Sequence, residues 1–294
     1  MKKIIYLFTV LLTVFAINSC DRMEDHDGNL LNDLDANQLG ITGDRFLYQE
    51  ESSIDTLAQY QYNGRKLVGV ITPEGVTTIV YSGELINKIS YVGIESGTEI
   101  KYTQLFTYDQ TGKKIVTITE NRTEQDNILN TTPDPIETFK TIYNVTYAGS
   151  STNKLETVIG MTGQVIPLTT FAYTSYEKAT FTYDAKANVS KVVKDYGGVV
   201  GGVPGASVQE DTYTFSNYDQ MKNPYFNLLP FSYIVSNTLT DPIRSYWFSK
   251  NNPKDISLSN ISLPIPITYS TTYTYDPQSY PLSGFGTNYD YRPF

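Results

Sequence analysis

Residues that act as nucleophiles, general bases or soft metal ligands are scarce in this sequence. It has one cysteine, Cys20, and one histidine, His26, both near the start of a chain of 294 residues. Serine–histidine–aspartate and cysteine–histidine catalysis need a histidine inside the fold, and zinc sites commonly use the same two residue types. The sequence therefore argues against these chemistries in the rest of the chain.

Carboxylates remain as candidates for catalysis, because glycoside hydrolysis requires only two Asp or Glu side chains. Glu95, Glu99 and Glu210 lie in predicted turns or loops, but spacing along the chain does not show which carboxylates meet in the fold. We therefore expect a protein that is not an enzyme. A carboxylate-only glycoside hydrolase is the alternative.

One segment near the N-terminus has the spacing of a calcium loop. In "NDLDAN", Asp33, Asp35 and Asn37 alternate like the first ligands of such a loop. The glycine at the sixth position and the glutamate at the twelfth are absent, however. We interpret the segment as a solvated acidic stretch, and we expect neither a metal nor a cofactor.

Aromatic side chains are abundant, with 25 Tyr, 13 Phe and one Trp. Tyrosines that recur at strand positions are expected to pack in cross-strand pairs. Tyr246, Trp247 and Phe248 are consecutive, and they cannot all face one core from a strand because successive side chains point to opposite faces. We predict that one of them lies on a surface, where an aromatic ring can contact a glycan or a protein. These three are the candidate ligand-binding residues.

A repeated phrase identifies the elements that carry such residues. "FTYDQTGKKIVTI" (residues 106–118) and "FTYDAKANVSKVV" (181–193) each combine an alternating strand, a turn that begins at Asp, and a second β-branched strand. Asp109 can accept backbone hydrogen bonds, and Gly112 can adopt the positive φ that closes the turn. In the copy we expect Asn188 at the comparable place, because Asn tolerates the left-handed conformation. Each phrase predicts a β-hairpin.

Five looser versions of the pattern predict an antiparallel meander of stacked hairpins. We expect an all-β fold with one large, twisted, partly wrapped sheet. The five versions cover residues 60–70, 80–92, 145–158, 213–225 and 273–285.

Three stretches interrupt this pattern. Residues 121–138 and 195–211 are predicted to be loops, the first because it is polar and contains proline, the second because it is rich in glycine. Residues 223–237 carry the one helix signal, with Asn223 as a cap and Pro224 in the first turn. At most one short helix is therefore expected.

The N-terminus has the pattern of a secretory signal. Lys2 and Lys3 precede an apolar run, residues 4–17, that is too short for a comfortable membrane span. The acidic stretch after Cys20 is typical of a flexible tether. Removal of the signal leaves 20 basic and 31 acidic residues, a balance of −11. This balance argues against nucleic acid as a partner, because phosphate binding needs clustered Lys and Arg.

The end of the signal, "NSC" (residues 18–20), resembles the lipobox of bacterial lipoproteins, although Asn18 and Ile17 match it loosely. The resemblance implies cleavage before Cys20 and acylation of that residue, and several acyl chains together anchor a protein strongly. The acidic stretch that follows resembles the surface-export signal of Bacteroidota lipoproteins. We therefore expect lipid anchoring in the outer membrane, facing the cell exterior, with the periplasmic face as the second choice.

The units F/Y-x-Y-D followed by Gly or Asn resemble the YD repeats of the RHS class. With "YDQMKNPY" and "FSKNNPKDI", they are similar to a family of Bacteroidota surface lipoproteins of unassigned function. The resemblance covers nearly all of residues 46–294 and brings no catalytic residues. Long RHS proteins form a closed shell around a cargo, which seven degenerate units without a cargo domain cannot do.

The predicted organisation has three parts: a signal peptide (1–19), an acylated cysteine with an acidic tether (20–45), and a YD-repeat-like β domain (46–294). Our leading hypothesis is a non-catalytic binding or scaffold protein of the cell envelope. Its expected partners are the membrane, through the lipid anchor, and a glycan or another envelope protein. A purely structural envelope component is a further alternative.

Overall fold

Antiparallel strands make up most of the fold. The computed structural model describes residues 43–126, 134–149, 153–263 and 265–294, so the predicted signal peptide, Cys20 and most of the tether lie outside them. Seventeen strands belong to one sheet. Their bounds are β1 (Arg45–Glu51), β2 (Thr56–Asn63), β3 (Lys66–Ile71), β4 (Gly75–Ser82), β5 (Leu85–Glu95), β6 (Thr98–Tyr108), β7 (Ile115–Gln125), β8 (Glu137–Tyr147), β9 (Leu155–Gln164), β10 (Ser175–Tyr183), β11 (Val189–Val200), β12 (Val203–Ser216), β13 (Asp255–Asn260), β14 (Ile267–Ser270), β15 (Thr274–Tyr275), β16 (Pro281–Gly284) and β17 (Thr287–Pro293).

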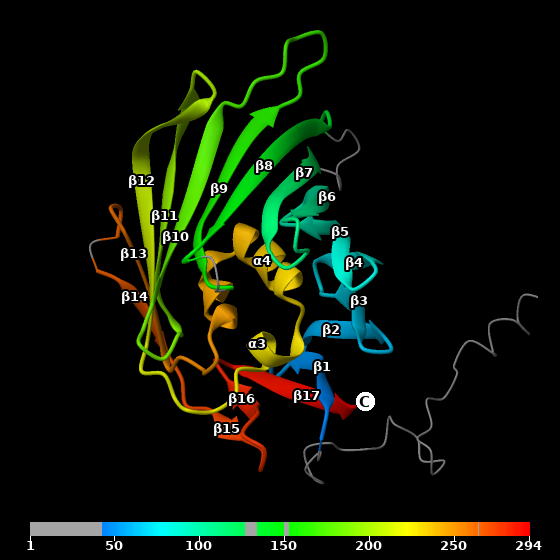
Figure 1. Cartoon of the computed structure of the whole chain (residues 1–294), viewed down its shortest axis with the longest axis vertical. Helices are drawn as coiled ribbons and strands as arrows, with labels where there is room; N and C mark the ends of the chain where they lie inside the picture. The colour runs from blue at the N-terminus through cyan, green and yellow to red at the C-terminus, as the bar shows by residue number, and fades with distance from the viewer. Residues whose placement is uncertain (1–42, 127–133, 150–152, 264) are drawn as a thin grey trace, which may run out of the picture. The chain divides into compact units, whose positions relative to one another are not determined.

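The strands form a single meander (Figure 1). Each strand from β1 to β13 pairs antiparallel with the next one in the chain. β15, β16 and β17 continue the sheet on the other side of β1. No pairing joins β14 to β15 within the described residues, so the sheet is open between them. This arrangement confirms the predicted all-β antiparallel meander with a partly wrapped sheet.

Six of the seven predicted hairpins are present. They are β2–β3, β4–β5, β6–β7, β8–β9, β10–β11 and β15–β16. The seventh, expected over residues 213–225, is wrong, because β12 ends at Ser216 and the chain continues into a helical segment.

Both predicted loops are shorter than expected, and the second of them is largely strand. β7 extends to Gln125 and β8 begins at Glu137, so the connection between them is shorter than residues 121–138. Within residues 195–211, only Gly201 and Gly202 leave the strands, and both have the positive φ of a tight hairpin turn. The alternation on which the sequence prediction relied is concealed by polar side chains on both faces in residues 121–125 and by glycines in residues 195–211.

The turn of the repeated phrase has the predicted geometry in its first copy. Gly112 has φ 68°, and its N–H donates to the carbonyl of Asp109 at 2.9 Å. The Asp109 carboxylate also accepts from the N–H groups of Lys113 and Lys114, at 3.0 and 3.3 Å. Aspartate therefore opens the turn as an acceptor, and glycine closes it.

In the second copy, the left-handed residue is Ala187 (φ 69°) rather than Asn188. Ala187 is the third residue after Asp184, as Gly112 is the third after Asp109. Asn188 is fully buried instead, and its amide donates to the carboxylate of Asp184 at 3.2 Å. The prediction for Asn188 is therefore wrong by one residue. It favoured asparagine, because asparagine tolerates the left-handed conformation, whereas Ala187 is the residue that adopts it.

The expectation of at most one short helix is also wrong, since three helical elements occur in the described residues. They are α3 (Pro224–Leu228), α4 (Phe231–Thr240) and the 3-10 helix η1 (Pro242–Phe248). The start signal itself is confirmed, because Asn223 accepts from the N–H of Tyr225 at 3.0 Å and Pro224 occupies the first turn. Pro230 has no N–H to continue α3, and it caps the start of α4.

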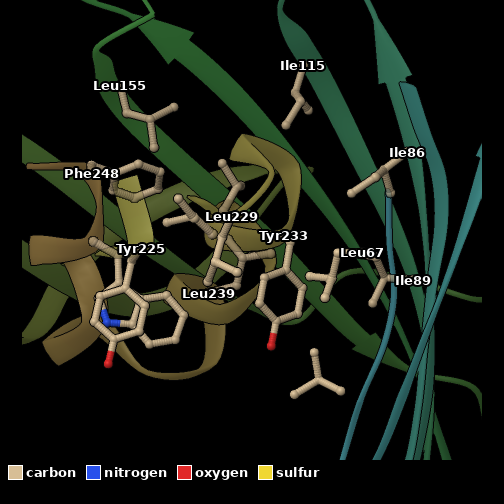
Figure 2. Close-up of a cluster of buried hydrophobic side chains, with 14 of the residues drawn as sticks. Leu67, Ile86, Ile89, Ile115, Leu155, Tyr225, Leu229, Tyr233, Leu239 and Phe248 are labelled. Atoms are coloured by element: carbon tan, nitrogen blue, oxygen red, sulfur yellow. The ribbon is translucent and has the colours of Figure 1, made fainter. Parts of the chain in front are cut away.

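This helical segment lies inside the curve of the sheet, where it forms the core (Figure 1). Strand side chains such as Leu67, Ile89 and Leu155 are fully buried and face it. Figure 2 shows these groups around Leu229 and Leu239 of the segment. Burial of each Leu or Ile side chain stabilises the fold by about 1.5–3 kcal/mol.

Repeat-position tyrosines pack the sheet, as predicted. Tyr62 and Tyr108 lie against the core, and each hydroxyl donates to a carbonyl of another hairpin. Tyr62 reaches the carbonyl of Leu47 at 3.0 Å, and Tyr108 reaches that of Ile86 at 2.7 Å. These bonds join successive hairpins through side chains as well as through the backbone.

Candidate functional site

The aromatic triplet lies in the core. Trp247 is 4% exposed and stacks on Tyr225 at 4.1 Å between ring centroids, and Phe248 is also buried. Tyr246 is partly buried, with its ring 5.9 Å from that of Tyr225. The expected exposure is therefore wrong for Trp247 and Phe248. The expectation assumed a strand, whereas the three residues belong to a 3-10 helix enclosed by strands and helices.

The carboxylates considered from the sequence are not brought together. Glu95 on β5 accepts from the hydroxyl of Tyr91 at 3.0 Å. Glu99 on β6 pairs with Lys101 at 2.7 Å, and Glu210 lies on β12. The segment with calcium-loop spacing lies outside the described residues, as does Cys20. Within the described ranges, no group of three or more His, Cys, Asp or Glu is placed to hold a metal ion.

A different set of polar residues converges on the inner face of the sheet. On β7, Ile118 is fully buried, and residues two apart share a face of a strand, so Glu120, Arg122 and Glu124 point the same way. The register places Glu120 opposite Gln104 of β6. We call the inward-facing surface formed by Tyr91, Tyr102, Gln104, Glu120, Arg122, Glu124, Phe139, Tyr143, Glu177 and Lys194 the polar inner face.

Helix α4 meets this face through a chain of hydrogen bonds. The hydroxyl of Ser236 donates to Oε1 of Gln104 at 2.6 Å. The amide of Gln104 donates in turn to Oε2 of Glu120 at 2.7 Å. All three residues are buried, so this chain fixes the Glu120 carboxyl where the packed core ends.

A second contact with α4 fixes another carboxylate. The Glu177 carboxylate and the Lys194 ammonium form an ion pair at 2.8 Å. Lys194 also donates to the carbonyl of Leu239, at the C-terminal end of α4, at 3.3 Å. The helix thus holds charged groups on two separate strands, β7 through Gln104 and β11 through Lys194.

Beyond these contacts, the polar inner face reaches solvent. Tyr102 stacks on Tyr91 at 5.1 Å between ring centroids. Arg122 pairs with Glu124 at 2.5 Å, and their side chains are 30% and 32% exposed, while that of Glu177 is 27% exposed. Aromatic rings beside paired charges offer both stacking and hydrogen bonds to a ligand.

Comparison with known proteins gives a limited result. No protein-family model and no curated protein matches this sequence. A porin-like protein from Bacteroides vulgatus ATCC 8482 aligns at a TM-score of 0.48 with 10% identity, covering 85% of this chain and 100% of that one. A porin-like protein from Bacteroides uniformis ATCC 8492 aligns at 0.42 with 15% identity, covering 83% and 95%. Likeness at this level identifies no ligand and no activity for this chain.

The electrostatics of the polar inner face centre on Glu120. Burial raises the pKa of its carboxyl above the usual value of 4.5, and the negative charges of Glu177 and Glu124 act in the same direction. The hydrogen bond from Gln104 and the charge of Arg122 oppose this shift. Burial also raises the pKa of Tyr102 and Tyr143, and the charge of Glu120 adds to both shifts.

These residues were not predicted as a site, because residues 121–125 of β7 were expected to form a loop. A usable signal was present, since Ile118, Glu120, Arg122 and Glu124 follow the period of two that starts in the core-facing part of the strand. Charges at inward positions mark the place where the core stops. In the described part of the chain, no helix is long and apolar enough to cross a bilayer.

Proposed function

We propose that this protein is a lipid-anchored component of the bacterial cell envelope that binds a ligand on its polar inner face. The location in the cell envelope is supported by the sequence alone, through the basic and apolar signal, the lipobox-like "NSC" and the single cysteine, Cys20. The outer surface of the outer membrane is the preferred location, because the acidic stretch after Cys20 resembles a surface-export signal.

The binding proposal rests on a change along β7, where the inward-facing side chains pass from apolar and buried to charged and partly exposed. Up to Ile118 the inward positions of β7 are apolar and covered, and from Glu120 onward they are charged and reach solvent at Arg122 and Glu124. Solvent-facing pairs contribute little to stability, so stability does not account for their placement at inward positions, which supports a role in binding.

A glycan fits this surface better than a flat protein surface. Sugars combine apolar ring faces with many hydroxyl groups. Tyr102 and Phe139 can stack on the ring faces. Arg122 can donate hydrogen bonds to the sugar hydroxyls, and Glu124 can accept hydrogen bonds from them. Binding rather than catalysis is supported by the partners of the carboxylates, since Glu124 and Glu177 are each engaged in an ion pair.

The anchor is tested by replacing its proposed lipid site. We expect Cys20→Ala to release the protein into the soluble fraction and to abolish labelling by a fatty-acid probe. Membrane partition that is unchanged in this variant would contradict the lipoprotein proposal.

Ligand binding is tested with the Cys20→Ala chain on a glycan array, followed by calorimetric titration of the glycans retained. Tyr102→Ala should weaken binding at least about tenfold, a loss of about 1.4 kcal/mol. Tyr269→Ala is the matched control, because this tyrosine lies on edge strand β14 and is 52% exposed. Equal affinity of the two variants would overturn the assignment of the polar inner face. Capture of an envelope protein with no glycan retained would replace the glycan by that protein as the ligand.

A further inference from the structure

Glu120 is a buried carboxyl that forms no ion pair with any described residue. It is 4% exposed, and its Oε2 accepts from the Gln104 amide at 2.7 Å. Its other oxygen, Oε1, accepts no hydrogen bond from the described part of the chain. A carboxylate in this position retains an unused acceptor and, when ionised, an uncompensated charge.

The charge of Arg122 acts on Glu120, but neither neighbouring basic group forms an ion pair with it. Arg122 is held by Glu124 at 2.5 Å, and Lys194 is held by Glu177 at 2.8 Å. Each of these pairs is neutral as a whole, so Glu120 gives this part of the polar inner face an excess of negative charge. A cationic group of a ligand would balance it.

Tyr143 provides a second polar group beside Glu120. Its side chain is 6% exposed, yet its hydroxyl makes no hydrogen bond within the described residues. The hydroxyl is not among the enclosed side-chain atoms that lack a partner, so it reaches solvent at the polar inner face. This one lies within electrostatic reach of both Glu120 and Glu177, whose charges add to the effect of burial on its pKa.

The ring of Tyr143 packs over Gly160 on the neighbouring strand. A Cβ on Gly160 would lie 2.6 Å from Cε1 of Tyr143 and 3.4 Å from Cγ of Glu177. The tyrosine ring and the stem of Glu177 therefore meet over this glycine. Tyr143 on β8 thus adjoins Glu177, and β8 pairs with β7, which carries Glu120.

On the basis of the glycan-binding function proposed above, we propose that Glu120, Tyr143 and Glu177 form a subsite for a protonated primary amine of the ligand, as in an amino sugar. An ammonium group has three donors and no acceptor. Three acceptors are available to it on these residues: Oε1 of Glu120, the Tyr143 hydroxyl and a carboxylate oxygen of Glu177. The ring of Tyr102 adds an aromatic wall that suits both a cation and a sugar ring.

The test compares three β-1,4-linked tetrasaccharides by calorimetric titration of the Cys20→Ala chain: glucosamine, N-acetylglucosamine and glucose. The glucosamine tetramer should bind at least about tenfold more tightly than the other two. Glu120→Gln should abolish this preference, because the amide keeps the shape and removes the charge. Tyr143→Phe should reduce it while leaving the melting temperature nearly unchanged, since the lost hydroxyl has no partner.

A matched variant separates the subsite from general attraction of an acidic protein for a polyamine. Glu99→Gln removes one charge from the opposite face of β6, where Glu99 pairs with Lys101, and it should leave the preference intact. An equal loss in Glu99→Gln and Glu120→Gln would overturn the subsite.

The remaining outcomes distinguish the subsite from the proposed function. Equal binding of all three tetramers that depends on Tyr102 would overturn the amine subsite and leave glycan binding in place. Failure of all three tetramers to bind, in a chain that retains other glycans through Tyr102, would also overturn the subsite alone. If no glycan is retained at all, the subsite and the glycan-binding proposal both fail.

Discussion

On β7, Ile118 and Glu120 are consecutive inward-facing residues, yet they belong to regions with opposite properties. Around Ile118, strand side chains pack on the helical segment and no surface remains. Around Glu120, the same face carries carboxylates, a guanidinium and tyrosines, and part of it reaches solvent. The strand period is the same in both regions. What differs is the cover that α4 provides.

The boundary between the regions is built from polar contacts of α4. Ser236 bonds to Gln104, and the carbonyl of Leu239 accepts from Lys194. A helix that buried only apolar groups would leave these contacts unmade. The comparison teaches that the helical segment has two roles: it fills the packed region, and it orients charged groups at the start of the polar inner face.

Each region also contains a buried glutamate, Glu50 or Glu120, and their environments differ. Glu50, in the packed region, accepts from the hydroxyls of Tyr60 and Tyr225 at 2.5 and 3.0 Å. Glu120 accepts from an amide and faces other charges. Tyrosine donors surround Glu50 on its side of the core, whereas Glu120 keeps a free acceptor beside the open surface.

The largest expected effect is on the free energy of unfolding, when one aromatic side chain is truncated in each region. Trp247→Ala should lower the free energy of unfolding by about 3–5 kcal/mol, because it leaves a cavity in the packed region. Tyr102→Ala should cost about 0.5–1.5 kcal/mol, the value of one stacked ring pair. Chemical denaturation monitored by circular dichroism measures both. Equal losses would mean that the polar inner face is packed as tightly as the core.

A smaller effect is expected at the boundary. Ser236→Ala should destabilise the fold by about 1–3 kcal/mol, because Oε1 of Gln104 would remain buried without its donor. Thr240→Ala, at the exposed end of the same helix, is the control and should change stability by less than about 0.5 kcal/mol. Thermal unfolding of the two variants, measured side by side, checks the difference. A neutral Ser236→Ala would show that the helix does not depend on this contact.

The smallest effect concerns pH. Burial is the largest cause of the raised pKa of Glu50 and of Glu120, so the folded state favours the neutral form of each. Their contribution to stability is therefore present below the usual carboxyl pKa and is lost as the pH rises through the raised values.

Glu50→Gln and Glu120→Gln should each make the free energy of unfolding less dependent on pH above the usual carboxyl range. The measurement is a series of denaturant titrations from pH 4 to pH 8. A slope in either variant as steep as that of the parent chain would contradict the raised pKa of the carboxyl replaced.

The sequence predicts the strands well where one face is apolar and the turn carries Asp and Gly. It fails where strands are polar on both faces, as between Asn121 and Gln125, because no alternation marks them. It also misses η1, since "PIRSYWF" lacks an apolar helical period, and the triplet within it was judged by the geometry of a strand. The polar inner face could not be found from the sequence, because it joins residues from β5, β6, β7, β8, β10 and β11 through the register of the sheet.

The central claim, that α4 covers one region of the inner face and leaves the other open to ligand, is tested most directly by hydroxyl-radical footprinting with mass spectrometry. Indole reacts at least as readily as phenol when both are exposed, so protection of Trp247 is informative. We expect oxidation of Tyr102 and Phe139 and protection of Trp247 and Tyr225, with a bound glycan reducing oxidation at the first pair only. Oxidation of Trp247 at the rate of Tyr102 would contradict the account.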